Sequence, residues 1–286
     1  MKLGVSYMLF DGIELLEHSI RQIRNEVDFL QVVYQEKSWY GLSLPKEDLD
    51  ELERLKKIGL IDDLKLFDSF DVKKEINEST LIECRNHERE KRIIGLKSCY
   101  EKGCTHYLSM DVDEFYVTKQ FIWAKKEIIK NNYDITRLRF INYVKYPTIH
   151  RGVAPDDRSC PFICKIYPNS KMGETFSIKE GVRAIIAEGV KPKIKLFDPI
   201  KILMHHMETV RKDVSIKYNS TARTVFDRTR TDELIKNIES INEESEHFNF
   251  DKIIFPTIGK VKLYKVENIF NIPYKDWLIN KNEVRS

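Results

Sequence analysis

Three carboxylates stand close together at Asp111, Asp113 and Glu114, directly after the apolar run 107–110. Like charges repel where water is excluded, so acidic side chains gather at the end of a buried strand mainly where a cation lies between them. Asp111 and Asp113 have the i, i+2 spacing that points two side chains the same way from an extended segment. Such oxygen ligands suit Mg²⁺ or Mn²⁺ better than zinc. The stretch therefore predicts a divalent-metal site, and such a metal usually holds a phosphate.

An acidic pair after a buried strand has other interpretations, and the residues leave them open. Mg²⁺-dependent phosphohydrolases of the haloacid-dehalogenase type use such a pair with the first aspartate as nucleophile, but there it ends the first strand of the chain. A metal-dependent carbohydrate-binding module without turnover would use the same ligands. A helix cap or an acidic surface cluster needs no ligand, although the apolar run before the motif is hard to explain on a surface.

The position and the residues of this motif resemble the Asp-x-Asp motif of GT-A glycosyltransferases. Bacterial family-2-like enzymes read Asp-x-Asp-Glu-Phe, as residues 111–115 do here. The resemblance covers roughly residues 3–225 and is strongest over 85–116 and 205–223. It implies metal-dependent transfer of a sugar from a nucleotide-sugar donor to a hydroxyl of a glycan or glycolipid. Among nucleotide sugars, a UDP-sugar is the expected donor. It also implies an inverting, hexosyltransferase-like reaction and a Mn²⁺ or Mg²⁺ cofactor held by Asp111 and Asp113.

Arginines follow one face of a helix that precedes the acidic motif. Arg85, Arg89 and Arg92 are spaced i, i+4 and i+7, so their guanidinium groups share that face. We interpret Arg89 and Arg92 as a solvated surface. Arg85 is predicted about one turn inside the helix, where a bound anion would relieve its conflict with the helix dipole. Arg85 and Asn86 also match an Arg-Asn pair that contacts the donor in the resembling enzymes.

A pair of histidines closes a predicted strand late in the chain, at His205 and His206. Strand alternation sends the two side chains to opposite faces, so one at most should reach a metal. Neutral imidazole beside two carboxylates is a suitable Mn²⁺ ligand. The segment 206–213 resembles the family's histidine followed by Val-Arg-Lys-Asp, and this resemblance favours His206 as the metal ligand over a merely packed histidine.

The chain departs from the family pattern after its second strand. Many family-2-like enzymes place an aspartate there to read the nucleotide base, whereas this chain has Gln35. The Gln35 amide can donate to and accept from a base edge, and Tyr7 or Tyr34 can stack on the base. We therefore expect Tyr7, Gln35 and Asp111 among the donor-binding residues, without a prediction of the base itself.

A catalytic base would be a carboxylate on the acceptor side of the sugar. The candidates in the region where the family places it are Asp156, Asp157, Glu174 and Glu180. Glu180, which precedes Gly181 after a short strand-like run, is the first choice among them, and a surface carboxylate is the alternative interpretation.

The elements that must position these residues alternate between strand and helix. Apolar spacing predicts strands at 3–9, 27–34, 64–67, 105–110, 134–144, 160–167 and 193–204, and helices at 13–23, around 49–55, 80–102, 119–131 and 231–246. The third helix is predicted to begin with a capping box of Thr80 and Glu83. Such alternation builds a mainly parallel sheet flanked by helices, with ligands bound beyond the carboxyl ends of the strands. We expect an α/β, GT-A (Rossmann-like) fold with a mixed acceptor-side region, and a C-terminal helical extension.

Length and composition are those of one enzyme-sized unit with an appendage. At 286 residues and 42% hydrophobic content the chain buries a sizeable core, and we divide it into a catalytic domain at 1–225 and a helical, aromatic extension at 226–286. A net charge of +3 with interspersed signs demands no nucleic-acid partner. The cysteines show no metal-type spacing and are interpreted as reduced residues.

No apolar run is long enough to span a bilayer, and the start lacks a signal-peptide pattern, so we expect a cytoplasmic protein. The tail 251–286 interleaves lysines with aromatic residues, and it is predicted to dock on the catalytic domain or on the inner face of a membrane. Packing on the catalytic domain is the preferred interpretation.

Overall fold

The structure is a computed structural model that describes residues 1–39, 41–68, 78–152, 154–173, 183–220, 228–250 and 259–277. Its first half alternates strands and helices, as the apolar spacing predicts. The elements are β1 (Leu3–Leu9), α1 (Ile13–Ile23), the 3-10 turn η1 (Arg24–Glu26), β2 (Phe29–Tyr34), α2 (Lys46–Lys57), β3 (Asp63–Leu66), α3 (Glu78–Glu101), β4 (His106–Asp111), β5 (Glu114–Phe115), α4 (Thr118–Asn131) and β6 (Ile135–Tyr143).

The second half consists mainly of short strands. They are β7 (Ile149–Arg151), β8 (Ser159–Lys165), β9 (Ser170–Met172), β10 (Ile185–Ala187), β11 (Ile194–Leu196), β12 (Met204–His206), the helices α5 (Val214–Ser220) and α6 (Arg228–Ser240), and then β13 (His247–Phe250) and β14 (Gly259–Lys265).

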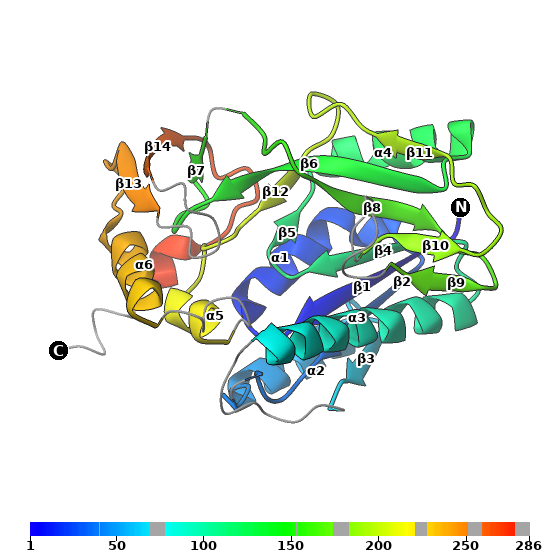
Figure 1. Cartoon of the computed structure of the whole chain (residues 1–286), viewed down its shortest axis with the longest axis horizontal. Helices are drawn as coiled ribbons and strands as arrows, with labels where there is room; N and C mark the ends of the chain where they lie inside the picture. The colour runs from blue at the N-terminus through cyan, green and yellow to red at the C-terminus, as the bar shows by residue number, and fades with distance from the viewer. Residues whose placement is uncertain are drawn as a thin grey trace.

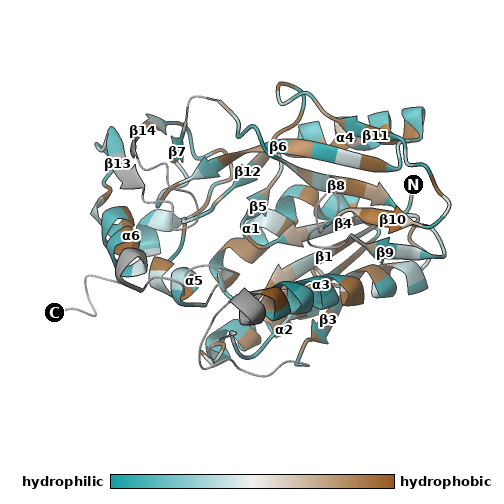
Figure 2. Ribbon diagram, viewed as in Figure 1, coloured by the Kyte–Doolittle hydropathy of each residue, from teal (hydrophilic) through white to brown (hydrophobic). Residues whose placement is uncertain are grey.

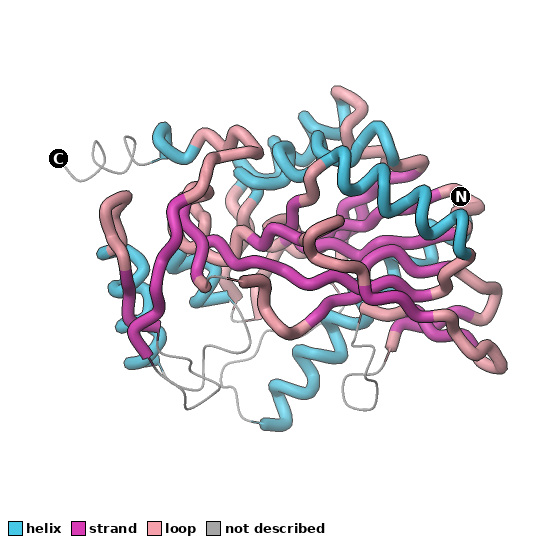
Figure 3. The backbone as a smooth tube through the Cα atoms, turned by 90° about the horizontal axis from the view of Figure 1, so that it is seen from above, coloured by secondary structure: helices cyan, strands magenta, loops and turns pink. Residues whose placement is uncertain are grey.

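The main sheet has the strand order β13-β14-β7-β6-β8-β4-β1-β2-β3 (Figure 1). Strands β1 to β4 pair in parallel, and β8 lies antiparallel between β4 and β6. Strand β12 pairs in parallel with β6 and antiparallel with the two-residue β5. Helices lie on both sides of the strands (Figure 3). The predicted α/β class, with a mainly parallel sheet flanked by helices and a mixed later region, is confirmed.

One face of β1 supplies the largest core. Leu3, Val5 and Leu9 are almost fully buried in one cluster with apolar residues of α1, α2 and α4. Because side chains alternate along a strand, the intervening residues face the other side of the sheet, where α3 packs. The central strand β8 is largely brown in Figure 2, whereas α6 carries both colours because only one of its faces is buried.

Helix α3 lies close to the sheet because glycines stand at its contacts. A Cβ on Gly4 of β1 would come within 2.5 Å of Cys99 Sγ. A Cβ on Gly95 of α3 would come within 2.6 Å of the Tyr107 hydroxyl, and it would also collide with Ser6. These glycines set the height of α3 over β1 and β4, and thereby the reach of the polar side chains in the preceding turns of the helix.

The structure corrects two boundaries. Helix α3 begins at Glu78, so Thr80 lies inside the helix and the predicted capping box does not form its start. Arg85 therefore lies about two turns inside the helix rather than one, and the helix-dipole reason for an anion there is lost. The single strand predicted over 193–204 is two short strands, β11 and β12, because the segment between them turns away from the ladder of β6.

The C-terminal part shares a core with the rest of the chain. Strand β14 pairs with β7, which extends the main sheet. Phe270, Tyr274 and Trp277 are at least nine-tenths buried in a cluster that also contains Leu15 and Phe115. Docking of the tail on the preceding residues is thus confirmed for the described part, 259–277. The predicted domain boundary at 225 lies outside the described residues, and so does the rest of the tail.

Candidate active site

Polar side chains from distant parts of the chain meet at the carboxyl edge of the sheet. Asp11 follows β1, Gln35 follows β2, Asp111 ends β4 and His206 ends β12. Strand β6 runs parallel to β4, since β8 is antiparallel to both, and β12 is parallel to β6. All these ends therefore point the same way. The predicted location of the acidic motif, beyond the carboxyl ends of the strands, is confirmed.

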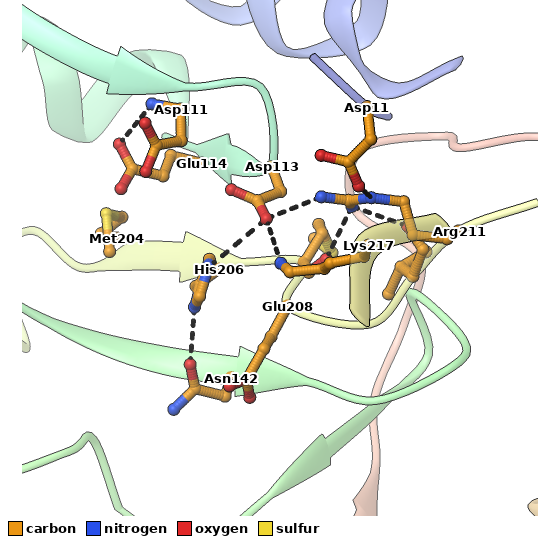
Figure 4. Close-up of polar contacts among 12 residues, drawn as sticks. Asp11, Asp111, Asp113, Glu114, Asn142, Met204, His206, Glu208, Arg211 and Lys217 are labelled. Atoms are coloured by element: carbon orange, nitrogen blue, oxygen red, sulfur yellow. Dashed lines mark hydrogen bonds and ion pairs between the residues drawn. The ribbon is translucent and has the colours of Figure 1, made fainter. Parts of the chain in front are cut away.

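The acidic motif forms a tight turn rather than one extended segment. Val112 and Asp113 are the turn between β4 and β5, and the Asp111 backbone N–H donates to Glu114 Oε2 at 3.1 Å. The expectation that the spacing of Asp111 and Asp113 points both carboxylates the same way is therefore wrong. Figure 4 shows the two side chains directed at different groups.

Asp111 faces two arginines. Arg92 of α3 donates from Nη2 to Asp111 Oδ1 at 2.8 Å and from Nη1 to Ser109 Oγ at 2.7 Å. Arg183 donates to the other oxygen of Asp111 and also to Glu114. Burial would raise the pKa of Asp111, but Arg183 and Arg92 outweigh it and lower the pKa to about 2. Asp111 is thus held ionised by protein cations.

Asp113 is buried, and a different set of cations surrounds it. Its Oδ2 accepts from Lys217 Nζ and from Arg211 Nη2, each at 2.7 Å, and lies 3.5 Å from His206 Nε2 (Figure 4). Its Oδ1 is buried and has no hydrogen-bond partner among the described residues. Burial would raise the pKa of Asp113, but Lys217, His206 and Arg211 hold it well below its usual value. The unpaired buried oxygen of a carboxylate is a vacant acceptor.

Arg211 is fixed in place by the surrounding backbone. Its side chain is 2% exposed, its Nη1 donates to the carbonyls of Met207 and Val210, and its Nε donates to Asp11 Oδ2 at 3.2 Å. The guanidinium passes over Gly12, where a Cβ would approach Nε to 2.9 Å. Gly12 also has a φ of +78°, which favours glycine. The start of α1 is therefore shaped around this arginine.

The two histidines point to opposite faces, as alternation predicts. His206 has its Nδ1 2.7 Å from Asn142 Oδ1 and turns Nε2 toward Asp113. His205 has its Nδ1 2.9 Å from the Tyr143 hydroxyl on the other face, and burial lowers its pKa to about 4. If the Asn142 oxygen accepts a hydrogen bond from Nδ1–H, the Nε2 lone pair of neutral His206 faces a carboxylate. That arrangement is favourable only with a proton or a cation between them.

Asp113 and His206 fit a divalent cation, whereas a metal-ligand role of Asp111 stays a prediction. Both oxygens of Asp111 are bonded to arginines. Among the described residues no group of three histidine, cysteine, aspartate or glutamate side chains is placed to hold a metal. Mg²⁺ and related ions are often held by one or two protein groups, with substrate phosphates and water completing the shell. The side chains present fit an ion of that kind, bound together with a phosphorylated ligand.

The predicted base-binding residues are packed. Tyr7 is fully buried, and its hydroxyl is 2.9 Å from Ser19 Oγ. Gln35 is 2% exposed; its Nε2 donates to the Lys37 carbonyl, and its Oε1 accepts from Lys91 Nζ at 3.1 Å. Burial lowers the pKa of Lys91 to about 8. Both predicted groups thus lie at or below the carboxyl edge with protein partners, and their contact with a donor stays a prediction.

Arg85 and Asn86 lie in the first half of α3, where Arg85 is half-buried and Asn86 is exposed. Arg92, which the sequence assigned to a solvated face, is the arginine of this helix that reaches Asp111. The reason is that α3 runs closely over β4 in the opposite direction, so that Gly95 lies against Tyr107 and Arg92, about one turn earlier, reaches the carboxyl end of the strand. A donor-binding role of Arg85 and Asn86 stays a prediction.

The candidate base Glu180 and its alternative Glu174 lie outside the described residues. Asp156 is paired with Arg158 at 2.6 Å, and Asp157 is fully exposed. The assignment of the base stays a prediction for all of them.

The cations of the site are the residues that sequence reasoning missed. Arg183 is 72 residues from Asp111, and Lys217 is 104 residues from Asp113, so no local pattern links them. Arg211 lies in the segment quoted for the resemblance, but no role was given to it. The signal that points to such residues is charge balance, because buried carboxylates need cations whether or not a metal binds.

Comparisons with known proteins add a distant structural likeness. The chain matches no protein-family model and no curated protein. The structure of S. aureus TarS overlaps 83% of this chain and 42% of its own, with 12% identity and a TM-score of 0.39. For S. aureus TarS 1-349 the shares are 50% and 36%, with 15% identity and a TM-score of 0.32.

The structure of mannose-1-phosphate geranyltransferase from Thermus thermophilus overlaps 61% of this chain and 49% of its own, with 10% identity and a TM-score of 0.29. In these three overlaps the chain spans less than half of the matched structure. Likeness at these TM-scores carries no argument about the reaction, which has to be inferred from the site itself. No described helix combines the length and the apolarity that crossing a membrane requires.

Proposed function

We propose that the chain is a metal-dependent GT-A-type glycosyltransferase. In this proposal it moves a sugar from a nucleotide-sugar donor to a hydroxyl of a glycan or glycolipid. The proposed donor is a UDP-sugar. The resemblance of residues 111–115 to the Asp-x-Asp-Glu-Phe motif supports the enzyme class. The geometry of the site supports the dependence on a metal. We assign the reaction to residues 1–225.

The observation that carries the proposal is the meeting of Asp113 and His206 at the carboxyl edge of the sheet. A buried carboxylate oxygen without a donor and an imidazole nitrogen turned toward the same carboxylate are suited to one hard cation. Mn²⁺ or Mg²⁺ bound there would stabilise negative charge on a departing nucleoside diphosphate. Asp113 and His206 are the residues that would hold it.

The protein cations have separate tasks in this proposal. Arg92 and Arg183 keep Asp111 ionised and fix its orientation, so that it can accept hydrogen bonds from donor hydroxyl groups. Arg211 holds Asp113 against the start of α1. Positive groups that already stand where charge develops stabilise a transition state without reorganisation.

An inverting reaction would need a carboxylate that takes the proton of the acceptor hydroxyl. Glu180 remains the first candidate, because it lies shortly before Arg183 in the chain, and Arg183 is bonded to Asp111. We also propose that the tail makes peripheral contact with the inner face of a membrane.

A thermal-shift screen of nucleotide sugars, each with and without Mn²⁺, tests the function. A true donor at ~100 times its dissociation constant stabilises the protein by about 2.7 kcal/mol. We expect stabilisation by one or a few nucleotide sugars that requires Mn²⁺, followed by slow hydrolysis of the same compound. Asp113→Asn should lose the Mn²⁺-dependent stabilisation. Asp63→Asn is its matched control and should keep the stabilisation, since it removes a carboxylate from the edge strand β3, away from the site.

Two results would contradict the proposal. Release of phosphate from small phosphoesters, with no response to nucleotide sugars, would identify a phosphohydrolase. Binding of free glycans with Mn²⁺ but without any nucleotide-sugar hydrolysis would identify a carbohydrate-binding module.

A further inference from the structure

Lys217 occupies the same carboxylate oxygen toward which His206 turns. Its Nζ is 2.7 Å from Asp113 Oδ2, and His206 Nε2 is 3.5 Å from that atom. A divalent cation held between Asp113 and His206 would therefore lie beside a lysine ammonium. Like charges at such short distances repel strongly in a partly buried site. Even a cation that uses the unpaired Oδ1 shares one carboxylate with the ammonium on Oδ2, so the cation and Lys217 compete for the charge of Asp113.

The charges of the site nearly balance without a metal. The described carboxylates paired with the cations of the cluster are Asp11, Glu88, Asp111, Asp113 and Glu114, and the cations are Arg92, Arg183, Arg211 and Lys217. A further double charge would leave the cluster with excess positive charge unless a cation leaves or an anion enters. A donor diphosphate would be such an anion.

Lys217 is the cation that is suited to leave. The Arg211 side chain is 2% exposed and is tied to Asp11 and to backbone carbonyls as well as to Asp113. The Lys217 side chain is 18% exposed, and the contact its ammonium makes is with Asp113 alone among the hydrogen bonds and ion pairs described for it. A lysine is a point charge on a flexible stem, whereas an arginine in a bonded fork is fixed.

We propose that Lys217 is an exchangeable counter-ion of Asp113, a positioning residue of the site. Without ligands, its ammonium neutralises the buried carboxylate. When a divalent cation binds Asp113 and His206, the ammonium leaves Asp113 and moves onto the phosphate oxygens of the donor. The inference rests on the proposed function for the identity of the donor. The competition between Lys217 and the cation does not depend on it.

The test measures Mn²⁺ binding without any nucleotide, by the loss of the electron paramagnetic resonance signal of free Mn²⁺. Lys217→Met should bind Mn²⁺ roughly tenfold more tightly than the wild type, equivalent to about 1.4 kcal/mol. Calorimetry with UDP at saturating Mn²⁺ should show the opposite change, a roughly tenfold loss of affinity. A residue with a merely structural role would weaken both.

Lys212→Met is the matched control, because Lys212 is an exposed lysine just before α5 and should change neither affinity. Lys217→Arg keeps the positive charge and should not gain Mn²⁺ affinity. Lys217→Gln keeps a hydrogen-bond donor and replaces the methionine variant if that protein does not fold.

Unchanged or weaker Mn²⁺ binding in folded Lys217→Met and Lys217→Gln would overturn the inference, and so would an absence of Mn²⁺ binding in all variants at millimolar concentration. The proposed function is judged separately, by nucleotide-sugar binding to the wild type. Tighter Mn²⁺ binding in the variant with no response to any nucleotide sugar would uphold the exchange and reject the glycosyltransferase.

Discussion

At the amino end of β4 the strand packs against α3 through close contacts, whereas at its carboxyl end Asp111 faces two arginines. Tyr107 lies near Gly95 in a cluster with Cys99 and Cys104 that is almost wholly buried. Four residues along the same strand, Asp111 is ionised and bonded to Arg92, which the same helix supplies. The difference teaches that the two ends depend on each other, because close packing at one end sets the distance that a charged group must reach at the other.

The largest expected effect is at the charged end. Asp113→Asn should keep the fold but lower metal-dependent turnover by about 1,000-fold, equivalent to roughly 4 kcal/mol, because the amide keeps the shape and loses the charge that binds the cation. Circular dichroism checks the fold, and donor hydrolysis across a Mn²⁺ titration checks the effect. An unchanged rate and Mn²⁺ dependence in a folded variant would remove Asp113 from the site.

The packed end should respond in stability instead. Gly95→Val should lower the free energy of unfolding by about 3 kcal/mol, because the new side chain collides with Ser6 and with the Tyr107 hydroxyl. Urea denaturation measures the loss. Lys97→Val is the control on the same helix, since it adds a β-branched residue at an exposed position. Equal losses in both variants would mean that α3 has room to move away from the sheet.

His206 and His205 offer a sharper comparison within one short strand. His206→Ala should raise the Mn²⁺ concentration for half-maximal activity by about tenfold. His205→Ala should leave it unchanged, because that ring contacts Tyr143 and Phe270 on the other face. The readout is a Mn²⁺ titration of donor hydrolysis. A larger effect from His205 would show that the register of β12 is wrong by one residue.

The smallest expected effect is a pH dependence at the amino end. Burial, with help from the N-terminus and Lys165, lowers the pKa of His106 to about 4 from a usual value of 6.5. Between these values the unfolded chain binds more protons than the folded one, so stability falls as the pH falls. From pH 6.5 to 5.5 we expect a loss of about 1 kcal/mol from this group. Urea denaturation at both pH values should show that His106→Gln is less sensitive to acid than the wild type; equal sensitivity would exclude His106 as the cause.

The strands and helices of the hydrophobic core were predicted well from the sequence, and the charged residues of the site only in part. Strand β1 and helix α1 have the predicted bounds, because a buried face repeats at the period of its element. The start of α3 was misplaced, because a capping pattern near Thr80 is local and the helix extends past it. Local patterns thus located elements better than their ends.

The acidic motif and His206 were found because they follow apolar runs at strand ends. Arg183 and Lys217 were not found, because their contacts with Asp111 and Asp113 depend on the path of the chain through the whole sheet. The turn at Val112 also escaped prediction, because pairing of β5 with β12 bends the chain directly after β4. A spacing rule for strands does not apply across such a turn.

The long sequence separations within the site have a consequence for synthesis of the chain. Asp11 and Arg211 are 200 residues apart, so at ~5–20 residues per second the ribosome takes about 10–40 s to add the second after the first. Strands β1, β2 and β4 and the carboxylates at their ends leave the ribosome well before Arg183, Arg211 and Lys217. During that interval Arg92 is the one cation of the four that is already present, so the carboxyl edge carries excess negative charge, which water must solvate. The nascent sheet therefore keeps this edge open until Arg183, Arg211 and Lys217 have been added, so the candidate active site closes late, followed by the packing of β14 and the residues after it.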